Sequence, residues 1–215
     1  MKKYGRLNQI SKKIIKNIKK NKLSTKIYKY YFVQIVYNIV TLKGDFQGRI
    51  IIKEEKEMPN IVLTRIDNRL VHGQVATQWC GPIGANLILV ANDEVAGNKL
   101  RQGLMDMAAP SYAAMRYWTI EKTISTIHKA SDKQHIFIVC ETPQDVLKLV
   151  EGGVPIKKVN IGNMHMADGK RQVAGSVAVD DDDVAAFAKL RDLGVELEIR
   201  RVPTEGAENI EKLFK

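Results

Sequence analysis

Cysteine is scarce in this chain, because its 215 residues include only Cys80 and Cys140. Two cysteines cannot build a disulfide framework for a chain of this length, and neither belongs to a CxxC or other metal-ligand spacing. Cys140 ends an apolar run at 135–140 and is expected to pack as a small hydrophobic residue. The sequence therefore excludes the disulfide-rich secreted class and favours a reducing, cytoplasmic environment.

Long hydrophobic runs are also missing. The best candidate, residues 30–40, follows a lysine-rich stretch and is interrupted by Gln34 and Asn38. It is shorter than the roughly 20 apolar residues that a membrane-spanning helix needs, and it lacks a small-residue cleavage site. Neither a transmembrane segment nor a secretory signal is expected. A basic helix that touches anionic lipid stays open as an alternative for this region.

The first 57 residues contain no alanine, proline, cysteine or tryptophan, although the later residues contain 16 alanines and all six prolines. They carry 15 Lys+Arg against 4 Asp+Glu, whereas residues 58–215 carry 19 against 20. The basic charge therefore belongs to the N-terminal extension alone. This removes the usual inference from a basic protein to a nucleic-acid partner.

The composition of the extension also suggests how it arose. Lys, Ile, Asn and Tyr, whose codons are rich in A and T, supply 32 of its 57 residues. Residues 53–57 (KEEKE), encoded by purines alone, directly precede Met58, as a ribosome-binding site would. We interpret residues 1–57 as a basic extension that is a misassigned start or is disordered, and residues 58–215 as one folded domain.

Beyond Met58, short apolar runs alternate with amphipathic stretches, as in a parallel sheet covered by helices. The runs predict seven strands, at 60–64, 86–91, 115–119, 134–140, 158–161, 176–179 and 195–200. The intervening stretches predict helices at 73–79, 98–108, 120–130, 143–151 and 181–193, with a closing helix at 209–214. The predicted fold class is α/β: an open, mostly parallel seven-stranded sheet, doubly wound, with helices on both faces.

Two helix starts have clear signals. Residues 142–145 (TPQD) offer an N-cap, a proline at the first helical position and an acid at the third, and the helix should stop at Gly152. Residues 180–183 are four aspartates, whose charge the next helix dipole favours. They could suggest a metal site, but adjacent side chains on a helix diverge around its axis. No metal and no other cofactor is expected.

Residues 65–75 (RIDNRLVHGQV) place one histidine and two arginines between a predicted strand and a predicted helix. Such a junction faces the ligand side of an open parallel sheet, where the first helical N–H groups are unpaired. Arg65 and Arg69 offer guanidinium forks that match phosphate oxygens, and His72 offers a nucleophilic nitrogen at neutral pH. The turn can therefore hold a phosphoryl group. The alternative is that His72 is only a packed or capping residue.

A nucleotide-binding P-loop is poorly supported at this turn. That motif needs a glycine-rich run that ends in Lys and Ser or Thr, whereas this stretch contains the single Gly73.

The amino-acid sequence of residues 67–75 closely resembles the phosphorylation site of the IIB components of the mannose family of bacterial sugar phosphotransferase systems. The resemblance covers most of the chain from Met58 onward. It continues through three further segments, 84–86 (GAN), 90–94 (VANDE) and 160–165 (NIGNMH). Within the family, the chain is most similar to the N-acetylgalactosamine-specific IIB proteins, on the strength of residues 64–69 and 159–165.

This resemblance implies a protein-histidine phosphate:sugar phosphotransferase. His72 would receive a phosphoryl group on Nδ1 from a phosphorylated IIA protein. The group would then pass to N-acetylgalactosamine or a related hexose or amino sugar during uptake through IIC and IID membrane partners. The protein would be cytoplasmic and would associate with the inner face of the membrane through those partners, and a homo-oligomer stays open. The alternative function is a soluble histidine-dependent enzyme that acts on a phosphorylated small molecule.

Arg69, three residues before His72, is predicted to stabilise the transferring group, assisted by the backbone amides of Gly73 and Gln74. Asp67 has two interpretations of equal weight. It could orient Arg69 or the imidazole, or it could be a turn residue whose side chain bonds its own backbone.

Three further residues are expected to support the site. Arg65 would contact phosphate or pair with an acid on a partner. Asn163 and His165 follow the fifth predicted strand and should reach the same sheet edge as His72. There His165 would line the phosphate pocket or contact the sugar-carrying partner.

Overall fold

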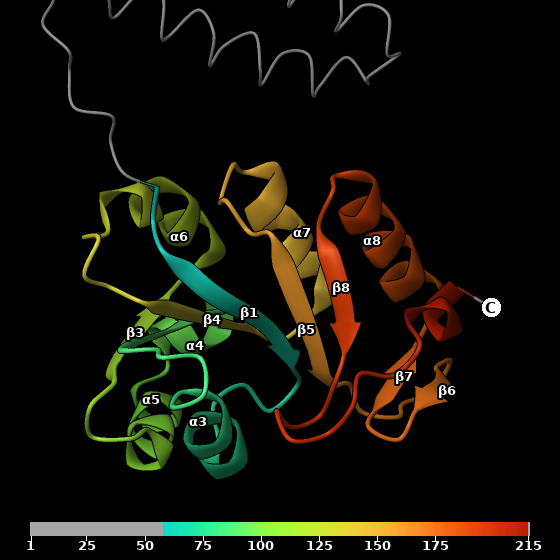
Figure 1. Cartoon of the computed structure of the whole chain (residues 1–215), viewed down its shortest axis with the longest axis horizontal. Helices are drawn as coiled ribbons and strands as arrows, with labels where there is room; N and C mark the ends of the chain where they lie inside the picture. Colours follow the sequence, from blue (N-terminus) through green and yellow to red (C-terminus); the bar gives the residue numbers. More distant parts are fainter. Residues whose placement is uncertain (1–57, 215) are drawn as a thin grey trace, which may run out of the picture. The chain divides into compact units, whose positions relative to one another are not determined.

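The structure, a computed structural model, describes residues 58–214, and the predictions made for residues 1–57 lie outside this range. Six parallel strands form its central sheet in the order β3-β2-β4-β1-β5-β8 (Figure 1). The strands are β1 (Ile61–Asp67), β2 (Leu87–Ala91), β3 (Ala114–Trp118), β4 (Ile136–Cys140), β5 (Lys158–Asn163) and β8 (Glu196–Ile199). The chain moves from β1 out to β2 and β3, returns through β4, and then crosses to β5 and β8. The sheet is therefore doubly wound, as predicted.

The prediction of a seventh strand in this sheet is wrong. Residues 177–179 do form a strand, β7 (Val177–Val179), but it pairs antiparallel with β6 (Arg171–Ala174), which the sequence analysis missed. To join the sheet as a parallel strand after β5, residues 177–179 would need a crossover connection of a dozen or more residues, usually a helix. No helix lies between β5 and β7, where the chain forms β6 instead. A hairpin needs only a tight turn.

The predicted helices are present, with the closing one formed as a 3-10 helix. The helical segments are α3 (Gly73–Trp79), α4 (Asp93–Gly97), α5 (Lys99–Ala108), α6 (Ile120–Thr126), η1 (Ile127–Lys129), α7 (Pro143–Glu151), α8 (Asp181–Asp192) and η2 (Ile210–Phe214). Both predicted starts are confirmed: the Thr142 side chain caps α7, and Asp180 forms a capping box with Asp183 at the start of α8.

Two apolar cores cover the two faces of the sheet. Strand β4 shows the division, because Ile136 and Ile138 pack into one core while Phe137 and Val139 pack into the other. The first core is closed by α6, α7 and α8, and the second by α3 and α5. Within the described residues, the second core includes β1 but no residue of β5 or β8. On that face, the ends of β5 and β8 beside α3 are therefore left for polar side chains.

Candidate functional site

His72 follows a turn at the carboxyl edge of the sheet, between β1 and α3. The turn is tightly built: Leu70 adopts a left-handed backbone with φ of 57°, its N–H donates to the Asp67 carbonyl over 2.8 Å, and its side chain is fully buried. Asn68 donates from its backbone N–H to the Asn163 carbonyl over 3.0 Å. Its side-chain oxygen accepts from the backbone N–H of His165 over 2.5 Å. The turn is thus fixed to the end of β5.

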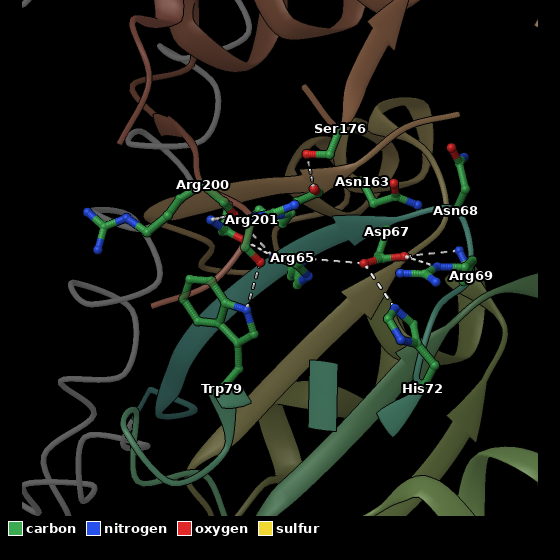
Figure 2. Close-up of polar contacts among 12 residues, drawn as sticks. Arg65, Asp67, Asn68, Arg69, His72, Trp79, Asn163, Ser176, Arg200 and Arg201 are labelled. Atoms are coloured by element: carbon green, nitrogen blue, oxygen red, sulfur yellow. Dashed lines mark hydrogen bonds and ion pairs between the residues drawn. The ribbon is translucent and has the colours of Figure 1, made fainter. Parts of the chain in front are cut away.

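Asp67 is the centre of the site (Figure 2). Its carboxylate is fully buried, and Oδ2 lies 3.0 Å from Nη2 of Arg65 and 3.5 Å from Nε2 of His72. Oδ1 accepts from the backbone N–H of Arg69 over 3.1 Å and lies 3.9 Å from the Arg69 Nε. The carboxylate therefore makes both kinds of contact considered for it, one with its own turn and one with the imidazole.

Arg65 is buried and forms an ion pair with Asp67. Its Nη1 donates to Oδ1 of Asn160 over 2.5 Å, and its guanidinium lies 5.3 Å from the ring centroid of Trp79. A Cβ on Gly162 would come within 1.8 Å of the Arg65 Cζ, so only glycine leaves room for this guanidinium. The Arg65 side chain is 3% exposed. It is therefore not available to an acid on a partner, which removes one of the two roles expected for it.

A small cavity of about 40 Å³ lies beside the imidazole. Its lining comes from four parts of the chain: Arg65, Arg69, His72, Val75, Gly162, Asn163, Ser176, Arg201 and Val202. Four of the expected site residues are thus brought together at the cavity, with Asp67 directly behind them. His165 is exposed and is not part of this lining; its Nε2 lies 3.5 Å from the Asn163 side-chain nitrogen. Gly73 and Gln74 supply the first two residues of α3.

Several residues of the site were not predicted from the sequence. Ser176 donates to the Gly162 carbonyl over 2.8 Å. Arg201 adds a second exposed cation to the lining, and its carbonyl accepts from the Trp79 indole over 3.4 Å. Arg201 could have been suspected, because it follows a predicted strand at the same sheet edge as His72. Ser176 carries no such signal in the sequence, and Gly162 lies within the resembling segment 160–165, where no role was assigned to it.

The surroundings of His72 favour the neutral form of its imidazole. Its partial burial lowers its pKa below the ordinary 6.5, and the positive charges of Arg69 and Arg65 act in the same direction, against Asp67. A carboxylate only accepts hydrogen bonds, so the contact with Asp67 places the proton on Nε2 and leaves a lone pair on Nδ1. His72 occupies the N-cap position of α3 but makes no side-chain capping bond. The capping interpretation is therefore excluded.

Comparison with known proteins identifies the family. Residues 61–215 match the family model described as PTS system sorbose subfamily IIB component. The chain belongs to this family. It is 55% identical, over 157 residues, to the N-acetylgalactosamine-specific phosphotransferase enzyme IIB component 2 of Escherichia coli. The matched region covers 73% of this chain and 100% of the relative.

Solved structures of IIB components share the fold. The N-acetylgalactosamine-specific IIB component 1 of Escherichia coli superimposes with a TM-score of 0.68 at 50% identity, covering 70% of this chain and 99% of that one. The IIB domain of the sorbose permease from Klebsiella pneumoniae gives a TM-score of 0.68 at 36% identity, covering 72% and 96%. The predicted family and α/β fold class are confirmed.

Membership also establishes the class of reaction. IIB components of this family take a phosphoryl group from a IIA protein and pass it to a sugar, and they work with IIC and IID components. This IIB component is accordingly a phosphotransferase, and the alternative of a free-standing enzyme for a phosphorylated small molecule is set aside. Within residues 58–214, none of the helices has the length and apolar character needed to cross a bilayer.

Proposed function

We propose that His72 carries the phosphoryl group on Nδ1 as a covalent intermediate, and that the final acceptor is N-acetylgalactosamine or a closely related sugar. One observation carries the first part. The Nε2 of His72 lies 3.5 Å from the buried Asp67 carboxylate, so Nδ1 is the nitrogen left with a lone pair, at a cavity lined by Arg69.

In the first step, the Nδ1 lone pair of His72 attacks the phosphorus atom of a phosphohistidine on IIA. The donor's P–N bond breaks and its electron pair returns to the donor imidazole. Positive charge develops on the His72 ring as the new P–N bond forms, and the Asp67 carboxylate stabilises it through the Nε2 proton. The Arg65 contact holds that carboxylate in place, so no reorganisation is needed during transfer.

Arg69 is the residue proposed to hold the transferring oxygens. Its side chain is 51% exposed, and its Nε lies 3.9 Å from Oδ1 of Asp67, a long distance for an ion pair. Arg69 can therefore turn toward the phosphoryl group without breaking a tight, buried contact. Arg201 lines the same cavity and can contribute a second guanidinium. The backbone amides of Gly73 and Gln74 open α3 directly after His72 and add donors at the same place.

Docking of phosphorylated IIA requires an accessible imidazole and a positive rim. His72 is 22% exposed, so an incoming phosphoryl group can reach it while most of the ring stays fixed. Arg69 is 51% exposed and would attract a phosphorylated, acidic surface. Arg201 is 65% exposed and ion-paired with Glu205 over 2.5 Å, so it would join this rim by exchanging Glu205 for the incoming phosphoryl group. In the second step, the same opening presents phospho-His72 to the sugar at IIC and IID, on the inner face of the membrane. The sugar hydroxyl oxygen then attacks the phosphorus atom and forms a P–O bond, the P–N bond breaks with its electron pair returning to Nδ1, and the hydroxyl proton is released to solvent.

The sugar assignment rests on the relatives. The two N-acetylgalactosamine-specific IIB components of Escherichia coli are 55% and 50% identical to this chain over nearly their full lengths. The fructose-specific and sorbose-specific components that it also matches are 36% and 37% identical.

The His72 assignment is tested by incubating the chain with phosphoenolpyruvate, the general phosphotransferase proteins and a matching IIA. Mass mapping should find one phosphoryl group on His72, labile in acid and stable in alkali. His72→Ala should take up none, whereas His165→Ala, a matched change at an exposed histidine of the same edge, should be phosphorylated like wild type. Full phosphorylation of His72→Ala would reject the site.

The sugar is tested separately with phospho-His72 and membrane vesicles that contain IIC and IID. Vesicles with N-acetylgalactosamine IIC and IID should discharge the phosphoprotein onto that sugar. Vesicles with sorbose IIC and IID, supplied with sorbose, should discharge the phosphoprotein at least tenfold more slowly. Equal discharge by both would show that this IIB component does not contribute to the choice of sugar, even with His72 confirmed.

A further inference from the structure

Helix α5 exposes a stripe of apolar side chains. Leu100, Leu104 and Met107 are 78%, 62% and 86% exposed, respectively. Together with Gly103 they occupy positions i, i+3, i+4 and i+7, which lie on one face of a helix. We call these four residues the α5 stripe. A surface helix normally turns its leucines toward the core, so this arrangement needs a separate explanation.

The stripe is not the result of a loosely packed helix. Met105 packs in the second core on the opposite side of α5. Gln102 is buried, and its amide nitrogen donates to the carbonyls of Val95 over 2.7 Å and Ala96 over 3.1 Å. The Asn98 side chain caps the helix start. Helix α5 is therefore fixed in its orientation by other contacts, and the stripe faces outward on a rigid support.

We propose that the α5 stripe binds α5 of a second copy of this chain, in an antiparallel pair with two-fold symmetry. The stripe is self-complementary about a point between Gly103 and Leu104. In an antiparallel pair centred there, Leu100 packs on Met107 of the partner subunit, and Leu104 packs over the partner's Gly103. Glycine has no side chain, so the two backbones can approach closely at the centre. Such an interface uses the same patch on both copies, as two-fold dimers do.

The charges beside the stripe favour the antiparallel direction. Lys99 and Asp106 are both exposed and lie toward opposite ends of α5. Antiparallel pairing brings Lys99 toward Asp106 of the partner subunit at each end of the interface, whereas in a parallel pair the flanks that carry these residues lie on opposite sides of the interface. The Asp106 carboxylate is held by a 2.7 Å hydrogen bond from Tyr117, so it is already positioned.

The size and composition of the surface fit a second copy. The three apolar side chains present on the order of 400 Å², within the range of the largest apolar patch on a monomer. Two such patches bury on the order of 800 Å², and the polar residues around them supply the rest of a standard interface. An apolar centre without charged residues is typical of homodimers. None of the residues that line the His72 cavity lies on α5, so the pairing is separate from the site.

Sedimentation equilibrium on the full chain, from about 1 to 500 µM, tests the proposal. Wild type should show a monomer–dimer equilibrium, and Leu104→Glu should weaken it at least 100-fold, because two carboxylates would meet at the centre. Leu193→Glu, at another exposed leucine on α8's carboxyl end, should dimerise like wild type. Leu104 is 62% exposed in the single chain, so both variants should keep the wild-type melting temperature at concentrations where wild type is monomeric. A wild type that is monomeric throughout overturns the proposal.

A cross-linking experiment tests the geometry. Nothing lies within 4 Å of a side chain built at Gly103, and the native Cys80 and Cys140 are buried. Under oxidation, Gly103→Cys should form a disulfide-linked dimer much faster than Leu193→Cys. Equal rates would contradict the pairing.

Two further measurements separate this interface from a docking site for other proteins. Each copy carries a formal net charge of +10, so added salt should not weaken the dimer, whereas a charge-driven contact would weaken. Leu104→Glu should also accept phosphoryl groups from IIA at the wild-type rate. A monomeric wild type combined with slow phosphorylation of Leu104→Glu would assign the stripe to the donor protein and overturn our proposal.

Discussion

Replacing Asp67 with asparagine should separate the role of this carboxylate in stability from its role in transfer. The substitution keeps the size of the side chain but removes its charge. It leaves the Arg65 guanidinium, 3% exposed and 3.0 Å away, without its counter-ion. Removing one partner of a buried ion pair costs about 3–5 kcal/mol of unfolding free energy. The hydrogen bonds from Arg65 to the Asn160 side chain and the Arg200 carbonyl remain, so we expect a loss at the lower end of that range.

The effect on transfer has a different cause. An asparagine amide at this position can donate to Nε2 of His72, which would move the imidazole proton to Nδ1 and block the attacking lone pair. The same change in a Ser-His-Asp triad costs about 10⁴-fold in rate through the wrong tautomer. The contact here is long, at 3.5 Å, so we expect a smaller loss of about 100-fold or more.

Rapid-quench measurement of phospho-His72 formation from phosphorylated IIA would give the rate per folded molecule, and urea unfolding would give the stability. Asp183→Asn is the matched control. Asp183 is also buried and ion-paired, with Lys170, but it lies at the start of α8. It should lose stability and keep its transfer rate. Transfer by folded Asp67→Asn at the wild-type rate would refute the tautomer argument, whatever the stability.

Three more predictions follow from the same geometry. Arg69→Ala should slow phosphorylation about 10²- to 10³-fold, yet change unfolding by less than about 0.5 kcal/mol because the side chain is 51% exposed; an unchanged rate in stopped assays would remove its proposed role. Because burial lowers the pKa of His72 below its ordinary 6.5, the initial rate should fall at a lower pH than it would for an unperturbed imidazole. The free energy of unfolding should also decrease as the pH falls below 6.5, because the unfolded state then binds a proton at His72 more readily than the folded state does. A rate already halved above pH 6.5 would contradict the lowered pKa. Gly162→Ala should cost about 3 kcal/mol by displacing the Arg65 guanidinium, whereas Gly175→Ala, which meets open space, should leave urea unfolding nearly unchanged; equal effects would disprove the close approach.

Much of the fold could be predicted because its signals are local. The alternation of apolar runs with amphipathic stretches indicated a parallel sheet with helices on both faces, and the caps at Thr142 and Asp180 marked two helix starts correctly. The run at 176–179 was correctly predicted as a strand but placed in the wrong sheet. A strand's apolar pattern reports that one face is buried, and it does not report which neighbour it pairs with.

The candidate site divides in the same way. The proposed nucleophile His72, Arg69 and Asp67 lie within six residues, so the short turn between β1 and α3 brings them together whatever the rest of the chain does. The environment of Arg65 could not be read from that segment. Asn160 and Arg200 are 95 and 135 residues away along the chain, and they meet Arg65 only because β5 and β8 follow β1 in the sheet.

The sequence by itself determined the family, most of the order of strands and helices, and the histidine that we propose carries the phosphoryl group, because each depends on residues close together in the chain. Only the tertiary structure showed which nitrogen of His72 contacts Asp67, which glycine makes room for Arg65, and that α5 turns its leucines outward. These features depend on hydrogen bonds, close contacts and burial between segments far apart in sequence. Spacing along the chain carries no record of them until the sheet brings those segments to one edge.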